Sequence, residues 1–195
     1  MLAPRKILGF AFRVLVYYGI AVALYSIVDT PYTYLFCRTS NVLYNTFSSR
    51  SHVDFQPDVH PTSSEDVTIL MEWFKPPGKR ETKLSARLTG YLPLMQVVAL
   101  ILASPVPWSR RLKRLIPGIL VIHAFIGFRL WAISFFVFAS LAPSQVGISQ
   151  FTADLVAIVA SPSPAFLVPP LVWLVIGFHA HLREMFAAQT LPRTH

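Results

Sequence analysis

The chain has 195 residues, of which 54% are hydrophobic, and it carries a formal net charge of +8. Its mean hydropathy is +0.53 and its sequence pI is near 10.0. About half of the residues fall in long apolar runs, which leaves no room for a large soluble catalytic domain. No basic and aromatic nucleic-acid module is present, so we expect anionic lipids rather than nucleic acid to meet the basic residues.

Four apolar segments approach the length that a helix needs to cross the roughly 30 Å hydrocarbon core of a bilayer. They are residues 7–28, 88–106, 115–141 and 166–180. The sequence therefore predicts an all-α integral membrane protein with about four transmembrane helices. Between the first and second spans it predicts a small extracytoplasmic β-rich insertion.

The first span reads as a retained signal anchor, since its apolar stretch is longer than the 7–15 residues of a signal peptide. Arg5 and Lys6 precede it and should lie in the cytoplasm by the positive-inside rule. Asp29, Thr30 and Pro31 are expected to end this helix.

The segment after the first span predicts an outer cap. Residues 31–47 are rich in Tyr and Phe and predict an interfacial helix. Alternating or β-branched residues predict strands at 52–56 and 67–74, and a turn at 76–79 leads to a third strand at 81–84. A cap of this size is too small to be stable without the membrane or a partner beneath it.

A basic cluster between the second and third spans gives the strongest topological signal. Its members are Arg110, Arg111, Lys113 and Arg114. We expect them in a short cytoplasmic connection that also meets lipid headgroups. Residues 145–161 form either a surface helix or the start of a broken span, and Ser161 to Pro164 interrupts any fifth span. Both termini should be cytoplasmic, in a cell inner membrane.

The organisation that follows has five parts. These are a signal-anchor helix (1–30), the extracytoplasmic cap (31–87), a transmembrane hairpin (88–142), a surface segment with the last span (143–185) and a cytoplasmic tail (186–195).

Arg129 is the first functional candidate, because a guanidinium in the middle of a span costs roughly 2.5–3.5 kcal/mol on insertion scales. It faces either a carboxylate, phosphate or substrate carbonyl inside the bundle, or backbone carbonyls or a neighbouring subunit. His123 is the second candidate. It lies six residues earlier on the same helix, about 120° around the axis, so the two cannot form one tight site alone.

His123 and His179 offer a possible pair of axial ligands for a haem or a chlorophyll-type pigment. Capping and interfacial hydrogen bonding are the commoner uses of such residues. No cofactor is therefore predicted, and the pigment site stays an alternative.

Nucleophilic and metal chemistry have weak candidates. Cys37 can be paired with His52 or His60, but an unreactive interfacial thiol is the simpler interpretation. The acidic residues between 54 and 66 match no calcium loop or zinc motif, and we interpret them as solvated loop charges.

The stretches Ala86-Arg-Leu-Thr-Gly-Tyr-Leu-Pro-Leu-Met, Leu100 to Pro105, Arg110 to Gly118 and Phe128-Arg129-Leu130 resemble the exosortase and archaeosortase group. They are also similar to the short membrane proteins that accompany exosortases. In the enzymes a catalytic cysteine begins one span on the outer side and an arginine ends a following span. The resemblance implies that Arg129 matches that arginine, but the corresponding start, Arg87-Leu-Thr-Gly90, has no cysteine. It therefore implies a cysteine-less relative or companion.

The sequence thus favours a non-catalytic accessory or scaffold subunit over an enzyme. We expect its spans to pack against a larger membrane protein complex and its outer cap to contact partners. An exosortase-like sorting or processing factor is the first alternative, and a haem- or pigment-binding subunit is the second.

Overall fold

The computed structural model describes residues 4–47, 51–58, 65–74, 77–141 and 149–178. In chain order these residues form α1 (Pro4–Phe47), β1 (Ser51–Pro57), β2 (Val67–Phe74), β3 (Pro77–Leu84), the π-helix η1 (Arg87–Tyr91), α2 (Leu92–Ala103), α3 (Trp108–Leu141), α5 (Gln150–Ala160), α6 (Ser163–Trp173) and the π-helix η2 (Leu174–Phe178). The chain is therefore mostly helical, with one small sheet between its first two helical regions.

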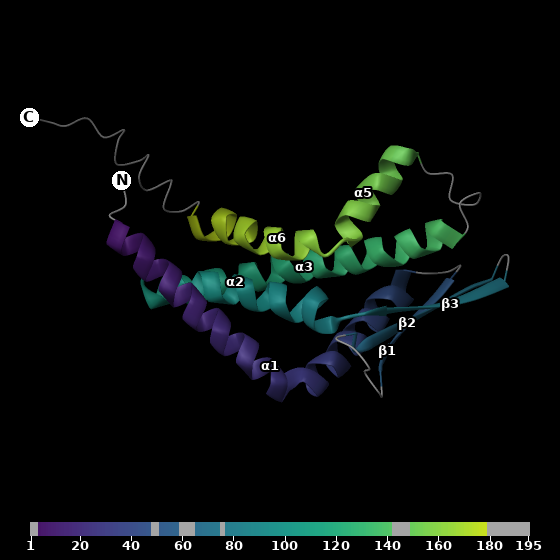
Figure 1. Ribbon diagram of the computed structural model, residues 1–195, viewed down its shortest axis with the longest axis horizontal. Coiled ribbons are helices and arrows are strands. Elements are labelled where there is room, and N and C mark those ends of the chain that lie inside the picture. The colour runs from purple at the N-terminus through teal and green to yellow at the C-terminus, as the bar shows by residue number, and fades with distance from the viewer. Residues whose placement is uncertain (1–3, 48–50, 59–64, 75–76, 142–148, 179–195) are drawn as a thin grey trace, which may run out of the picture.

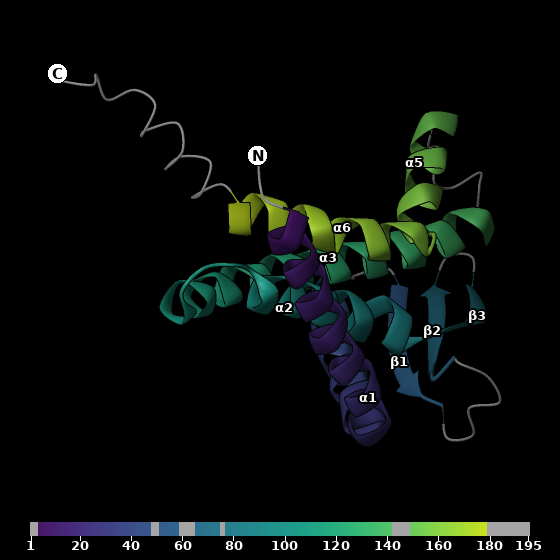
Figure 2. The ribbon, with the colours of Figure 1, turned by 60° about the vertical axis from the view of Figure 1, so that its left-hand side comes forward.

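The helices α1, α2, α3 and α6 form a bundle, and the sheet lies at one end of it, called here the sheet end (Figures 1 and 2). At the other end, α1 begins and a short connection joins α2 to α3. The Phe10 ring stacks on Trp173 there at 5.3 Å, and Trp173 Nε1 donates to Ser104 Oγ at 2.8 Å. We call this the basic end, because α3 opens with the cluster Arg110 to Arg114.

The first helix is longer than the sequence predicts. α1 runs through Pro31 without a break, so the expected stop at Asp29 to Pro31 and the separate helix at 31–47 are wrong. An interior proline costs about 3 kcal/mol. Contacts on both sides of it hold the chain helical: Tyr25 and Thr33 donate to the same carboxylate, that of Asp66. α1 bends in its middle instead (Figure 1), as helices do at proline.

The sheet is antiparallel in the order β1-β2-β3. The strand predicted at 52–56 from alternation and the strand predicted at 67–74 from its β-forming residues are both confirmed. The third strand begins earlier than predicted, at Pro77 rather than after a turn at 76–79. The register explains this, because Lys79 lies opposite Glu72 and pairs with it at 3.5 Å.

One face of the sheet is buried against the helices. The apolar side chains on it are Val53, Phe55, Val67, Ile69, Met71 and Leu84. They belong to the same hydrophobic cluster as Phe36 of α1, Ile101 of α2 and Leu130 of α3. The sheet and the bundle thus share one core, which agrees with a cap that needs support beneath it.

α2 and α3 form an antiparallel hairpin, closely packed at Gly118. A Cβ at Gly118 would lie 2.6 Å from Ile101 Cδ1 and 3.3 Å from Val97 Cγ1, so only glycine lets the helices approach this far. The basic cluster is not in a loop, as predicted, but in the first turns of α3, which begins at Trp108. The helix starts early because the connection needs only residues 104–107.

The last helical region is broken where the sequence predicts. α5 ends at Ala160 and α6 begins at Ser163, and the two helices are bent by 79°. α5 projects from the bundle, whereas α6 lies along α3 toward the basic end (Figure 1). The segment 145–161 therefore contains a separate helix, and the span expected at 166–180 corresponds to α6 with η2.

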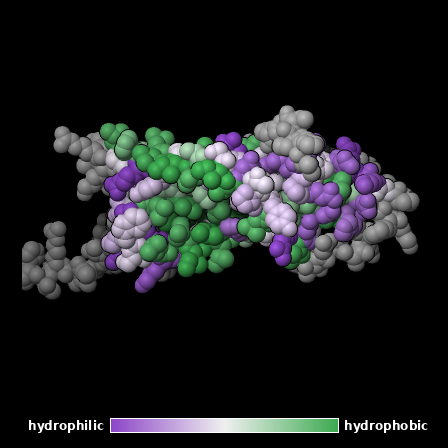
Figure 3. All heavy atoms as spheres, turned by 90° about the horizontal axis from the view of Figure 1, so that it is seen from below, coloured by the Kyte–Doolittle hydropathy of each residue, from purple (hydrophilic) through white to green (hydrophobic). Residues whose placement is uncertain are grey.

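The outer surface of the bundle is apolar. Its exposed residues include Leu8, Leu15 and Ile27 of α1, Ile116 and Leu120 of α3, and Leu167 and Val175 of α6 and η2. Figure 3 shows a hydrophobic band across the bundle, with polar residues on both sides of it. A continuous apolar surface of this kind marks contact with lipid or with another protein.

Two helical stretches, Ile7–Tyr44 and Trp108–Val137, are long and apolar enough to cross a membrane. The bent pair Phe151–Ala160 and Ser163–Ile176 passes the same test when taken together, and Arg87–Ala103 is apolar but shorter. These helices support the prediction of a membrane protein.

Candidate functional site

Arg129 of α3 is the most deeply buried charged side chain among the described residues. It is only 4% exposed, and its Nε and Nη1 are enclosed without a hydrogen-bond partner in the part of the chain that the structure describes. A buried ion normally has a counter-ion or several hydrogen bonds, because removing it from water is expensive. The guanidinium therefore lacks the compensation that its burial requires.

The helix geometry shows where Arg129 lies. It follows Gly118 by eleven residues, about three turns, so both project from the same face of α3. Gly118 touches α2 at Ile101. Because α2 runs antiparallel to α3, Arg129 lies about 16 Å closer to the sheet end, at the level of η1, which α3 contacts. Arg129 thus lies where the bundle meets the sheet.

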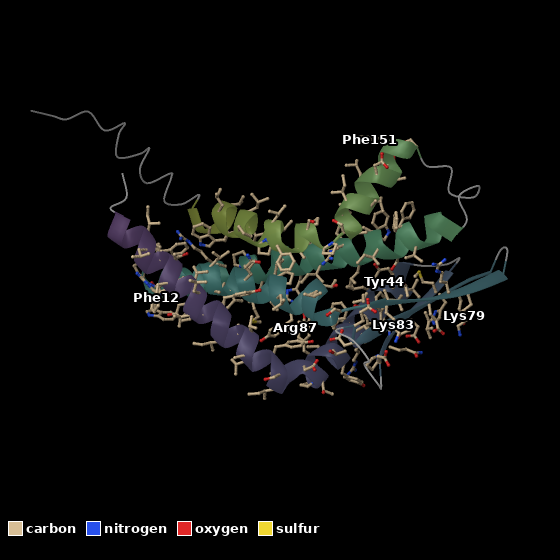
Figure 4. The ribbon with its side chains drawn as sticks, viewed as in Figure 1. Phe12, Tyr44, Lys79, Lys83, Arg87 and Phe151 are labelled. Carbon is tan, nitrogen blue, oxygen red and sulfur yellow. The ribbon has the colours of Figure 1, made fainter. Side chains whose placement is uncertain are left out.

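A second arginine lies at the same level. Arg87 opens η1, and its Cζ lies 5.1 Å from the centre of the Tyr25 ring. Figure 4 shows Arg87 between α1 and the start of α2. Its Nε is also enclosed without a hydrogen-bond partner among the described residues, although its charge rests on an aromatic face. The sheet end of the bundle therefore holds two guanidinium groups.

Asp66, just before β2, is the best-compensated charge in the structure. Its Oδ2 accepts from the Tyr25 hydroxyl at 3.0 Å and from Thr33 Oγ1 at 3.3 Å. Its Oδ1 accepts from the backbone N–H of Ala86 at 2.6 Å, at the start of the η1–α2 helix. A carboxylate here also meets the positive end of the helix dipole. Asp66 thus ties α1 to the beginning of the next helix.

Asn41 of α1 pairs with the edge strand β1. Its Nδ2 donates to the Phe55 carbonyl at 3.0 Å, and its Oδ1 accepts from the Phe55 N–H at 2.7 Å. Nδ2 also donates to Asp54 Oδ1 at 2.9 Å. One amide side chain therefore satisfies both backbone groups that an edge residue would otherwise offer to another strand.

Two more buried polar groups lie beyond Arg129. The Tyr44 hydroxyl at the end of α1 faces Ser134 of α3, but the two oxygens do not meet hydrogen-bond geometry within the described structure. The Tyr44 ring also packs on Phe55 of β1 at 5.2 Å. α3 therefore continues past Arg129 alongside the sheet.

Only one of the two histidine candidates lies among the described residues. His123 is exposed on α3, and its Nδ1 is 2.7 Å from the Ile119 carbonyl of its own helix. His179 lies outside the described residues. The pigment site therefore stays a prediction.

Cys37 does not form a nucleophilic pair in the described structure. It is only 3% exposed, while His52 is exposed on the sheet and His60 lies outside the described residues. Cys37 lines a shallow pocket of about 560 Å³ between α1 and β1, together with Tyr34, Arg38, Asn41, Val42, Phe55 and Pro57. A thiol buried among such neighbours is a packing residue.

Two acidic residues of the cap that the sequence predicts to be solvated loop charges also accept hydrogen bonds. Asp54 accepts from Asn41 and Gln56, and Asp58 accepts from Lys83 at 2.8 Å. No group of three or more metal-ligating side chains occurs within the described ranges. The hydrogen bond and charge of Asp58 raise the pKa of Lys83.

One residue of the basic cluster has a structural role that the sequence did not reveal. Arg111 donates to the Leu102 carbonyl at 2.7 Å and to the Val106 carbonyl at 2.6 Å, and its Cζ lies 4.9 Å from the Trp108 ring. It therefore caps the end of α2, where carbonyls lack helical partners. Nothing in the structure tests the predicted contacts of Arg5, Lys6, Arg110, Lys113 and Arg114 with lipid headgroups.

Comparisons of the chain with protein-family models, with curated proteins and with solved structures find no match.

No pattern in the sequence predicts the hydrogen-bonding roles of Asp66 and Asn41. Their partners are 13 to 41 residues away, and no motif links such distant positions.

Proposed function

We propose that this chain is a non-catalytic integral membrane subunit that packs against a larger membrane protein complex. The observation that carries the proposal is the buried guanidinium of Arg129, which has no counter-charge among the described residues. An uncompensated buried charge costs about 3–5 kcal/mol, which a partner can relieve. The described part of the isolated chain therefore contains a buried positive charge without a counter-charge.

In this proposal four helical segments cross the bilayer: α1, η1 with α2, α3, and α6 with η2. Trp108 lies at the basic interface, where aromatic residues are favoured. Arg129 follows it by 21 residues, about 32 Å along a helix, which is close to the thickness of the hydrocarbon core. The basic end faces the cytoplasm with both termini, and the sheet lies outside an inner membrane, where it contacts partners.

The absence of a catalytic constellation among the described residues supports a subunit rather than an enzyme. The lone thiol is buried, and no histidine lies beside it in the described structure. Without a thiolate and a base there is no route to an acyl-enzyme.

The mass of the native particle tests the proposal. The tagged chain is extracted from its own membrane in digitonin and measured by size-exclusion chromatography with light scattering. We expect a protein mass several times the 21.9 kDa of the chain. A particle whose protein mass is that of one chain alone would contradict the proposal.

An exosortase-like processing factor is the second candidate, and the place of Arg129 favours it. The resemblance implies an arginine at the outer end of a span, and Arg129 lies at the sheet end of the bundle. In this reading Arg129 orients a substrate segment. Unchanged processing of surface proteins in an Arg129→Ala strain would eliminate it. A colourless purified protein would likewise eliminate the pigment site at His123 and His179.

A further inference from the structure

We propose that Arg129 is the receptor for a carboxylate group, which the partner supplies at the sheet end of the bundle. This inference rests on the proposed function and names the chemistry of the contact. It depends on three observations about Arg129: its burial, the lack of an acid within the described chain to pair with it, and the exposed aromatic residues at its level on α3.

The chain itself does not provide the missing anion within the described residues. No ion pair there includes Arg129, whose Nε and Nη1 have no hydrogen-bond partner either. Eight of the nine acidic residues of the chain lie in the described ranges. The ninth, Glu184, lies outside the described residues. The complementary charge is therefore expected from outside this chain.

The enclosure of Arg129 favours a carboxylate over a lipid phosphate. An acidic side chain presents two oxygens on a narrow stem and matches a guanidinium in a planar, charge-assisted pair. A phospholipid phosphate is tetrahedral and carries two bulky ester substituents. With only 4% of Arg129 exposed, the narrow group requires far less opening of the bundle than the bulky one.

An exposed aromatic surface lies at the level of Arg129 on α3. Phe128 and Trp131 are 52% and 48% exposed, and their rings stack at 5.8 Å. Trp131 also stacks on Phe135 at 5.2 Å. Aromatic residues next to an arginine are the residues that most often dominate binding energy at protein interfaces. These rings lie about 100–160° around α3 from Arg129, so a partner that covers them contacts α3 at the level of Arg129 but on a neighbouring face.

The carboxylate site is tested with acetate as the probe. The full chain, with ¹⁵N-labelled arginine, is placed in phosphatidylcholine nanodiscs, and the Nε–H resonance of Arg129 is assigned by its loss in Arg129→Gln. We expect a saturable shift of this resonance with sodium acetate and a much smaller one with inorganic phosphate at equal ionic strength. The resonance of Arg13, whose Nε donates to the Gly9 carbonyl of its own helix, is the internal control and should not shift.

Two results would overturn the inference. The first is no saturable shift with acetate, which means that water or backbone carbonyls compensate the charge. The second is a shift on replacing phosphatidylcholine by phosphatidylglycerol but none with acetate, which identifies a lipid headgroup as the ligand. Both are measured on the wild-type chain, and the Arg129→Gln variant serves only to assign the resonance.

The native particle separates this inference from the proposed function. If the wild-type chain purifies in a large particle, Arg129→Gln should release it as a lone chain, whereas Arg13→Gln should leave the particle intact. A large particle in both variants would refute the carboxylate contact alone. A lone wild-type chain would refute the proposed function itself, whatever acetate does.

Discussion

Asp66 and Arg129 lie at the same end of the bundle, but their surroundings differ completely. Asp66 accepts three hydrogen bonds from α1 and from the start of the η1–α2 helix. Arg129 is more deeply buried and has no partner for Nε or Nη1 among the described residues. The carboxylate is satisfied by its own chain and therefore serves the fold. The guanidinium has no such partners for Nε and Nη1 among the described residues, and this difference is the basis of the proposed contact.

The largest expected effect comes from removing the satisfied charge. Asp66→Ala deletes three hydrogen bonds to a carboxylate and should lower the free energy of unfolding by about 3 kcal/mol. The measurement is unfolding in mixed micelles of dodecylmaltoside and SDS, followed by tryptophan fluorescence. Glu72→Ala is the matched control, since its ion pair with Lys79 is exposed and should contribute little. Equal stability of the two variants would show that Asp66 is not the tie between α1 and the next helix.

Gly90 tests the close contact that surrounds Asp66. A Cβ at this position would clash with the Tyr32 hydroxyl and lie 3.0 Å from Phe36 Cε2, so α1 and η1 must move apart in Gly90→Ala. We expect a loss of about 1–3 kcal/mol in the same unfolding assay. Gly19→Ala is the control, because a Cβ there meets nothing within 4 Å. It should stabilise the helix by up to about 1 kcal/mol. A neutral Gly90→Ala would mean that the contact is loose.

Asn41 gives a smaller effect at the edge of the sheet. Asn41→Ala removes its hydrogen bonds to the Phe55 backbone and to Asp54, and should cost about 1 kcal/mol because water replaces part of them. Hydrogen exchange at the Phe55 amide is the direct measurement and should become faster. Asn41→Asp keeps the acceptor for that amide and should preserve most of its protection, so equally fast exchange in both variants would contradict this assignment.

The smallest effect belongs to the exposed pair of Lys83 and Asp58. Because the pKa of Lys83 is raised in the folded state, the pair contributes stability below the unfolded pKa of lysine and loses it as the pH rises through the folded value. Asp58→Asn should return the pKa of Lys83 to its ordinary value, measured by NMR of the Nζ group. We expect almost no change in stability at neutral pH, since the pair is exposed. An unchanged pKa of Lys83 in Asp58→Asn would show that Asp58 is not the cause.

The local features of the fold could be predicted from the sequence. Strands β1 and β2 follow from alternating side chains, and the break before α6 follows from Ser161 to Pro164. The continuous α1 could not be predicted, because local rules weigh only the lost N–H of Pro31. The contacts that compensate this loss come from Asp66, which lies 41 residues from Tyr25 and 33 residues from Thr33.

The sequence predicted Arg129 as a candidate residue, but it did not predict what surrounds this side chain. Arg129 stands out in an apolar run, and its burial agrees with that signal. Its level in the bundle depends on the antiparallel packing of α3 on α2 at Gly118, and its missing partner depends on where every acid of the chain lies. Neither is a property of the residues near Arg129 in sequence.

The 44-residue helix α1 has a mechanical consequence. Its length is about 66 Å along the axis, so the same helix reaches from the basic end of the bundle to the sheet. The helix that precedes the sheet is thus continuous, and Asp66 accepts hydrogen bonds from it on both sides of its bend. A molecule bound to the sheet would therefore contact a part of the chain that continues as one bent helix to the opposite end of the bundle.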